Sequence, residues 1–352
     1  MKKIQLDSKN TVYNFCEPYI IAEVGANHNG DMELAKKMIL SAKQNGANCA
    51  KFQSWTPSSL IAKEEYERNQ VYNDSKKKHF GSLNEMVKKY ALSNDQHKEL
   101  KDYCDDNDIE FASSPFSTKE AKLLNDLDVS FFKIASMDIN YFDFLREIAA
   151  YNKPMILSTG MATLGEIDKA VEVCYREGND KLILLHCISI YPPEYKDIHL
   201  NNITMLQQAF DLPVGFSDHT IGTSIPLASA ALGACLIEKH FTLDKELPGW
   251  DHEISATPDE LKTISTESKN IIRSLGNYKR TVSQAEESKK LKFRRSLVAI
   301  DRIPKGTIIT QENVSAKRPG TQIPPSQIEF VVGRVAKQDI EADILIKWED
   351  LE

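Results

Sequence analysis

The chain has 352 residues, of which 41 % are hydrophobic and 27 % are charged, a composition typical of globular domains with a large buried core. Acidic residues outnumber basic ones by 51 to 44, and the formal net charge of -7 disfavours nucleic acid as the main partner. The sequence lacks an apolar run of about 18 residues, so we expect no membrane span. The six cysteines have no C-x-x-C spacing, which predicts reduced thiols and a cytoplasmic location.

Eight short apolar runs follow one another over the first 240 residues. They are continuously apolar rather than alternating, as expected for strands covered on both faces. Amphipathic segments lie between them, with helix-start residues such as Asp31, Ser93 and Ser117 and with stop glycines such as Gly46 and Gly178. The predicted strands are 19–24, 49–53, 109–113, 131–135, 155–158, 182–186, 214–217 and 236–239.

Strands that alternate with helices at this spacing predict an α/β fold, a (β/α)8 TIM barrel over residues 1–280. A doubly wound sheet is less favoured because the first turn, GANHNG, lacks a G-x-G-x-x-G pattern. Residues 281–293 are highly charged and predict a linker. Residues 294–352 contain only short strands and turns, and so small a segment is expected to dock on the barrel or on a partner subunit.

Polar side chains follow the carboxyl ends of all eight predicted strands, the end at which barrel enzymes build their sites. Two lysines and several serines among them have the composition of an anion site, which indicates a phosphate or carboxylate substrate. The alternative is that the serines only cap the helices that follow. These residues are Lys51, Ser114, Lys133, Ser136, Ser158 and Ser217.

Two histidines, His219 and His240, end the last two strands, where their imidazoles could converge on a divalent ion such as manganese. Either histidine alone would more often be structural. Glu23 faces the same mouth from the first strand, where it could position or deprotonate a water; its alternative role is an ion pair with a lysine. His28 is a weaker candidate. The other histidines, His79, His97 and His199, are interpreted as surface residues.

Motifs along the chain, taken together, resemble the sialic acid synthase family. They are IAEVGANHNGD (21–31), AKFQS (50–54), SSPFS (113–117), FKIAS (132–136), ILSTGM (156–161), LLHCISIYP (184–192), GFSDHTIG (215–222), IEKHFTLDK (237–245), PGWDHE (248–253), RRSLVA (294–299) and KRPG (317–320). The resemblance implies an enzyme that condenses phosphoenolpyruvate with an N-acyl amino sugar to give a nine-carbon 2-keto acid and phosphate.

The family's architecture implies a barrel followed by a small β-clip domain, the SAF or antifreeze-like domain, which covers the other subunit's barrel mouth in a domain-swapped homodimer. The resemblance also implies a divalent metal, manganese or alternatively magnesium or cobalt, on His219 and His240, with Glu23 as the catalytic carboxylate. Residues implied to hold phosphoenolpyruvate are Lys51, Ser114, Lys133, Ser136, Ser158, Ser189 and Ser217. Residues implied to hold the sugar are Gln53, Asp138, Tyr191, Asp251 and, from the partner chain, Arg318.

Two stretches depart from the family's neuraminate-type members. Ser136-Met137-Asp138 stands where they usually read S-G-E. Ser189 stands where many neuraminate and legionaminate synthases carry Asn, and together with SSPFS and KIAS it favours a pseudaminate type. The PGWDHE motif is nearer the neuraminate and legionaminate types. The acceptor is therefore either N-acetylmannosamine or one of the di-N-acetyl trideoxyhexoses that lead to legionaminate and pseudaminate. More remote alternatives are a barrel aldolase that uses pyruvate and a non-catalytic ice- or carbohydrate-binding protein.

Overall fold

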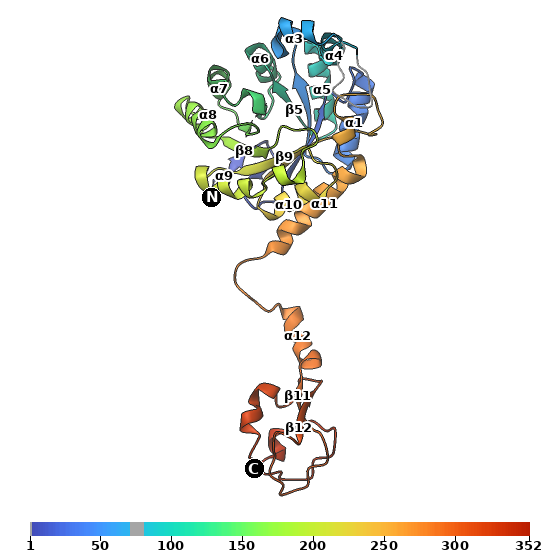
Figure 1. Cartoon of the computed structure of the whole chain (residues 1–352), viewed down its shortest axis with the longest axis vertical. Helices are drawn as coiled ribbons and strands as arrows, with labels where there is room; N and C mark the ends of the chain where they lie inside the picture. Colours follow the sequence, from blue (N-terminus) through green and yellow to red (C-terminus); the bar gives the residue numbers. More distant parts are fainter. Residues whose placement is uncertain (1, 71–80) are drawn as a thin grey trace. The chain divides into compact units, whose positions relative to one another are not determined.

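A computed structural model describes residues 2–70 and 81–352. The chain forms two compact units, Met1–Gly276 and Asn277–Glu352 (Figure 1). His79 and part of the long polar segment after the second strand lie outside the described residues. Among the described helices, none is both long enough and apolar enough to cross a membrane.

Eight parallel strands form the centre of the first unit. Their order in the sheet is β5-β4-β3-β10-β9-β8-β7-β6, and the end strands β5 and β6 lie next to each other, so the barrel is nearly closed. All eight predicted strands are confirmed, with ends that shift by at most two residues. The strands are β3 (Tyr19–Gly25), β4 (Cys49–Ser54), β5 (Glu110–Pro115), β6 (Phe132–Ile134), β7 (Met155–Ser158), β8 (Leu182–Cys187), β9 (Val214–Asp218) and β10 (Leu236–His240).

Helices follow each strand and surround the barrel (Figure 1). Asp31 and Ser93 cap α1 and α5 as predicted, each accepting backbone N–H groups of the first turn. Ser117 lies at the cap position of α6, but its hydroxyl donates to Glu120 instead. The helices are α1 (Met32–Gln44), α2 (Pro57–Leu60), α3 (Lys63–Arg68), α4 (Leu83–Tyr90), α5 (Asn94–Asp106), α6 (Thr118–Asp126), α7 (Phe142–Ala149), α8 (Leu164–Arg176), α9 (Asn201–Phe210), α10 (Ser224–Ala231) and α11 (Pro258–Leu275).

A short amino-terminal hairpin, β1 (Ile4–Gln5) with β2 (Thr11–Val12), closes one end of the barrel. Its buried Ile4, Leu6 and Val12 form a cluster with apolar side chains from the first residues of the barrel strands. Because this end is filled with apolar side chains, the polar inward-facing residues gather at the opposite, carboxyl end. The sequence analysis did not predict this hairpin, whose strands have two residues each.

The second unit is a small β domain with its own apolar core, which includes Leu297, Ile309 and Val331. It contains the antiparallel strands β11 (Ser296–Ala299) and β12 (Val314–Lys317). Helix α12 (Gln284–Phe293) precedes them and occupies most of the segment predicted as a linker. The domain boundaries proposed from the sequence stay a prediction.

Candidate active site

A cavity of about 880 Å³ lies at the carboxyl ends of the barrel strands, and every one of the eight strands contributes a lining residue. It brings together thirteen of the fifteen residues assigned to a site from the sequence. These are Glu23, Lys51, Gln53, Ser114, Lys133, Ser136, Ser158, Ser189, Tyr191, Ser217, His219, His240 and Asp251.

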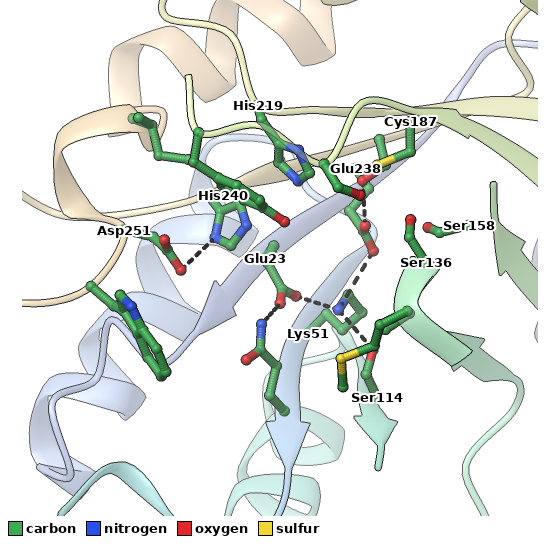
Figure 2. A pocket seen from close by; sticks show the side chains of 18 of the residues that line it. Glu23, Lys51, Ser114, Ser136, Ser158, Cys187, His219, Glu238, His240 and Asp251 are labelled. Carbon is green, nitrogen blue, oxygen red and sulfur yellow. Dashed lines mark hydrogen bonds and ion pairs between the residues drawn. The ribbon is translucent and has the colours of Figure 1, made fainter. Parts of the chain in front are cut away.

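Strand register explains why these side chains meet. Glu23 is the Cα partner of both His240 on β10 and Lys51 on β4. Paired residues of neighbouring parallel strands point to the same side of the sheet, so these three side chains form one layer inside the barrel. Figure 2 shows Glu23 between His240 and Lys51.

Two lysines and two glutamates form a buried ion-pair network in the cavity. Lys51 Nζ lies 2.6 Å from Glu23 Oε2 and 3.6 Å from Glu238 Oε2, and Lys133 Nζ lies 3.3 Å from Glu238 Oε1. All four residues are at most 5 % exposed. Gln53 also donates to Glu23 at 2.8 Å. The ion pair considered as the alternative role of Glu23 is therefore present, and the four charges compensate one another.

The two glutamates differ in proton affinity. Burial raises the pKa of Glu23, and the attraction of Lys51 offsets only part of this rise. Burial also acts to raise the pKa of Glu238, but Lys133, Lys51 and a hydrogen bond from Ser217 at 2.8 Å outweigh it and lower the pKa below its usual value. Glu238 is thus a fixed negative charge, whereas Glu23 is the better proton acceptor.

Glu238 was given no role by the sequence analysis, although the IEKHFTLDK motif (237–245) contains it. The signal that identifies it is register: Glu238 is the Cα partner of Ser217 on β9, which was already assigned to the site. A glutamate in that position has to face the same cavity.

The assigned serines do not act as helix caps. Ser117, Tyr141, Thr163 and Thr223 occupy the cap positions of the helices after β5, β6, β7 and β9, so the alternative role is wrong for the four strand-end serines. The strand-end hydroxyls instead face the cavity, as in an anion site.

Hydroxyl groups crowd around Gly160 at one side of the cavity. The Gly160 N–H donates to Ser136 Oγ at 3.1 Å, and a Cβ at Gly160 would lie 2.7 Å from that oxygen and closer still to Ser189 Oγ. Ser158 Oγ is buried and has no hydrogen-bond partner within the described part of the chain. On the lysine side, Ser114 accepts a hydrogen bond from Lys51 at 3.1 Å. These groups provide directional donors beside two cations.

The imidazoles of His219 and His240 converge, with ring centroids 5.5 Å apart. His219 Nδ1 donates to the Ile188 carbonyl at 2.7 Å, which leaves its Nε2 for a ligand, and His240 Nδ1 lies 3.6 Å from Asp251 Oδ2 (Figure 2). Burial lowers the pKa of both histidines and keeps them neutral, the form that binds metal.

This pair of neutral imidazoles fits a divalent ion whose other ligands are water or substrate oxygens. Among residues 2–70 and 81–352, no group of three or more His, Cys, Asp or Glu side chains is arranged as a complete metal site. Tyr191, which is half-exposed, lies over His219 with the two ring centroids 4.0 Å apart.

An aromatic wall lines the cavity on the side of the loop that carries Asp251. Trp55 packs against Phe116 and, edge to face, against Trp250, with ring centroids 6.0 and 6.4 Å apart, and Leu60 adjoins them. In Figure 2, Asp251 lies beyond His240, on the opposite side from Ser136 and Ser158. The cavity therefore has a cationic, hydroxyl-rich side and an aromatic side. The sequence analysis assigned no role to these aromatic residues, although PGWDHE contains Trp250.

Two assigned residues do not line the cavity. Asp138 lies in a 3-10 turn just after Ser136, where burial, partly countered by Lys133, raises its pKa to about 6. Arg318 belongs to the second unit, where it is exposed and lies 5.1 Å from the centroid of the Phe293 ring.

The other described histidines are partly buried and partly exposed, and one of them differs from its predicted exposure. His28 is buried, and its Nδ1 accepts the Gly30 N–H, so it does not face the cavity. The interpretation of His97 as a surface residue is wrong. It is a buried residue of α5 and forms hydrogen bonds with the Ser54 hydroxyl and the Ser93 carbonyl. His199 is exposed, as expected.

Comparison with known proteins agrees with the resemblance seen in the sequence. Residues 38–280 match the NeuB family and residues 294–352 match the SAF domain. An N,N'-diacetyllegionaminic acid synthase of Campylobacter jejuni is 41 % identical over 93 % of this chain and 98 % of its own length. A pseudaminic acid synthase of Helicobacter pylori is 33 % identical over 95 % of this chain and 98 % of its own.

A solved structure of N-acetylneuraminic acid synthetase from Leptospira borgpetersenii, in complex with citrate, superimposes with a TM-score of 0.72 at 34 % identity. It covers 82 % of this chain and 95 % of the other. Both parts of this chain are accounted for by these matches, and the relatives are synthases of N,N'-diacetyllegionaminic, pseudaminic and N-acetylneuraminic acid. The chain therefore belongs to the NeuB family and carries a carboxyl-terminal SAF domain.

Proposed function

We propose that the protein condenses phosphoenolpyruvate with an N-acyl amino sugar to form a nine-carbon 2-keto acid and inorganic phosphate. One observation carries the proposal: a single cavity combines a cationic hydroxyl-rich subsite, a glutamate of raised pKa and two convergent neutral imidazoles. Each of these groups has a task in this reaction.

The donor is held on the cationic side. Lys51 and Lys133 attract the phosphate and carboxylate of phosphoenolpyruvate, which also accept hydrogen bonds from the serine hydroxyls. Residues proposed for this task are Lys51, Ser114, Lys133, Ser136, Ser158, Ser189 and Ser217. The unpartnered, buried Ser158 hydroxyl supports this placement, since a buried donor without a partner carries a desolvation penalty that a bound anion removes.

His219 and His240 would hold a divalent ion, in our proposal manganese, with magnesium or cobalt as alternatives. When bound, this ion supplies Lewis-acid polarisation of the acceptor's aldehyde oxygen. The Ile188 carbonyl at His219 Nδ1 fixes the orientation of that ring, and Asp251 lies beside His240 Nδ1.

The proposed condensation forms one C–C bond and breaks the C–O bond between carbon 2 and phosphate. Carbon 3 of phosphoenolpyruvate attacks the aldehyde carbon of the open-chain sugar, and positive charge develops at carbon 2. Water adds to carbon 2 while Glu23 takes one of its protons and passes it to the former aldehyde oxygen, which becomes a hydroxyl. The C–O bond to phosphate then breaks, and phosphate leaves with the remaining hydroxyl proton of carbon 2, so that carbon 2 becomes the ketone. The raised pKa of Glu23 suits a group that must accept and later release a proton.

The acceptor sugar is placed against Gln53, Tyr191 and Asp251, next to the aromatic wall of Trp55, Phe116 and Trp250. Such a wall favours apolar substituents, namely the methyl and acyl groups of a di-N-acetyl trideoxyhexose. The higher identity to the legionaminic acid synthase supports the same choice. We therefore propose a legionaminate-type acceptor, with a pseudaminate type and N-acetylmannosamine as the alternatives. Asp138 would act from just outside the cavity.

We place Arg318 of one subunit at the sugar subsite of its partner in a domain-swapped homodimer, and we place the enzyme in the cytoplasm. An exposed arginine on a compact domain that follows a charged segment supports such an exchange.

A phosphate-release screen tests this function. The enzyme is incubated with phosphoenolpyruvate, Mn2+ and, separately, N-acetylmannosamine and the two di-N-acetyl trideoxyhexoses. We expect the fastest release with the precursor of legionaminate. Product formation from pyruvate instead would support an aldolase, although Lys51 is poorly suited to a Schiff base because Glu23 and Glu238 outweigh burial and raise its pKa. Absence of turnover with every sugar would refute the proposal.

A further inference from the structure

A buried polar cluster lies next to the cavity, at the carboxyl ends of β9 and β10. It consists of Asp218, Thr220 and Lys239. Lys239 Nζ lies 2.6 Å from Asp218 Oδ2 and donates to the Thr220 carbonyl, also at 2.6 Å. Asp218 accepts the Thr220 N–H at 2.9 Å and the Thr220 hydroxyl at 3.1 Å. All three residues are at most 2 % exposed.

This cluster directly adjoins both histidines of the site. Asp218 precedes His219 and Lys239 precedes His240, and the two charged residues are Cα partners across β9 and β10. Successive side chains of a strand point to opposite faces, so the histidines face the cavity while the ion pair faces away from it. The pair therefore does not line the cavity, and it acts on the site only through the backbone.

The contacts fix the backbone around His219. Asp218 holds the N–H of Thr220 and Lys239 holds its carbonyl, so the residues before and after His219 are tied to the same ammonium group. That ammonium belongs to β10, one residue before His240. The cluster thus joins the two segments that carry the imidazoles.

Stability alone does not account for this arrangement. Removing two charges from water carries a desolvation penalty that can equal their attraction, and buried pairs can often be replaced by apolar residues without loss of stability. We infer that Asp218 and Lys239 are a positioning pair, which sets the relative orientation of His219 and His240 for a divalent ion. This inference rests on the metal site of the proposed function.

The test compares Mn2+ binding by the full-length protein without substrates, measured by the electron paramagnetic resonance of free Mn2+, with thermal unfolding. Lys239→Met leaves a buried aspartate uncompensated, so we expect a lower melting temperature and at least tenfold weaker Mn2+ binding. The double variant Asp218→Asn/Lys239→Met buries no unpaired charge but still lacks the link to Thr220. It should melt near the wild type and still bind Mn2+ at least tenfold more weakly.

Two further variants separate positioning from stability. His97→Gln disturbs a buried hydrogen-bonded histidine on α5, so it should lower the melting temperature and leave Mn2+ affinity unchanged. Lys239→Arg keeps the charge but changes the donor geometry, so the folded protein should bind Mn2+ at least threefold more weakly.

Wild-type Mn2+ affinity in the folded double variant and in Lys239→Arg would overturn the inference and leave the proposed function intact. A wild-type protein that binds no Mn2+ would overturn the inference together with the assignment of manganese to the two imidazoles, whereas the condensation itself is tested by phosphate release.

Discussion

Gly160 offers a sharp test of the donor subsite, because a single methyl group there would displace the hydroxyls that we assign to phosphoenolpyruvate. The Cβ of Gly160→Ala would lie 2.7 Å from Ser136 Oγ, whereas ordinary contacts begin at 3.4 Å, so that oxygen must move by about 0.7 Å. Ser189 Oγ would have to move further. Both are ends of side chains that can rotate away, so folding should be little affected.

The binding loss can be estimated from the displaced hydrogen bonds. A hydrogen bond to a charged group contributes about 1.5–3 kcal/mol, so losing one should raise KM for phosphoenolpyruvate by roughly 10- to 150-fold. The KM for the sugar should change much less, because Ser136, which contacts Gly160, lies on the opposite side of the cavity from Asp251 (Figure 2). The assay is initial-rate phosphate release with each substrate varied in turn, together with thermal unfolding.

Gly165→Ala is the matched control, since a Cβ there meets nothing within 4 Å and the residue lies in α8. It should leave both KM values unchanged. A Gly160→Ala enzyme with wild-type KM for phosphoenolpyruvate, or with equal losses for both substrates, would refute the placement of the donor.

Three other predictions concern the proton acceptor, a buried carboxyl group and the second subunit. Glu23→Gln should fold and still contact Gln53, but should lose about 100-fold or more in kcat because the amide cannot take a proton; a wild-type rate of phosphate release would exclude Glu23 as the base. Burial raises the folded-state pKa of Asp138 to about 6 from 3.8, so ionisation destabilises the fold as pH rises from about 4 to 6. Asp138→Asn should therefore gain up to about 3 kcal/mol in urea unfolding at pH 7 and almost nothing at pH 3.5, and an equal gain at both values would contradict the shift. Arg318→Ala mixed with Glu23→Gln should recover about a quarter of the wild-type activity, since half of randomly paired chains are heterodimers with one complete site each; no recovery in verified heterodimers would exclude a shared site.

Much of the barrel could be predicted from local sequence because parallel strands covered on both faces need continuous apolar runs, and few other structures do. All eight strands were found this way. The short amino-terminal hairpin escaped because two-residue strands carry no periodic signal; only contacts between Ile4, Leu6 and the barrel interior establish it. His97 was misassigned for a related reason: a polar side chain looks exposed in sequence, and only its partners Ser54 and Ser93 make burial tolerable.

For the site, the sequence by itself determined which residues end the strands, and strand alternation then places most of them in one cavity. Only the tertiary structure decided their electrostatics. Glu23 and Glu238 are chemically alike. The number of lysines and hydroxyls around each, brought from the three strands β4, β6 and β9, decides that one pKa is raised and the other lowered. The same holds for the link from Lys239 to Thr220, because a contact across neighbouring strands depends on register and distance, which no local pattern encodes.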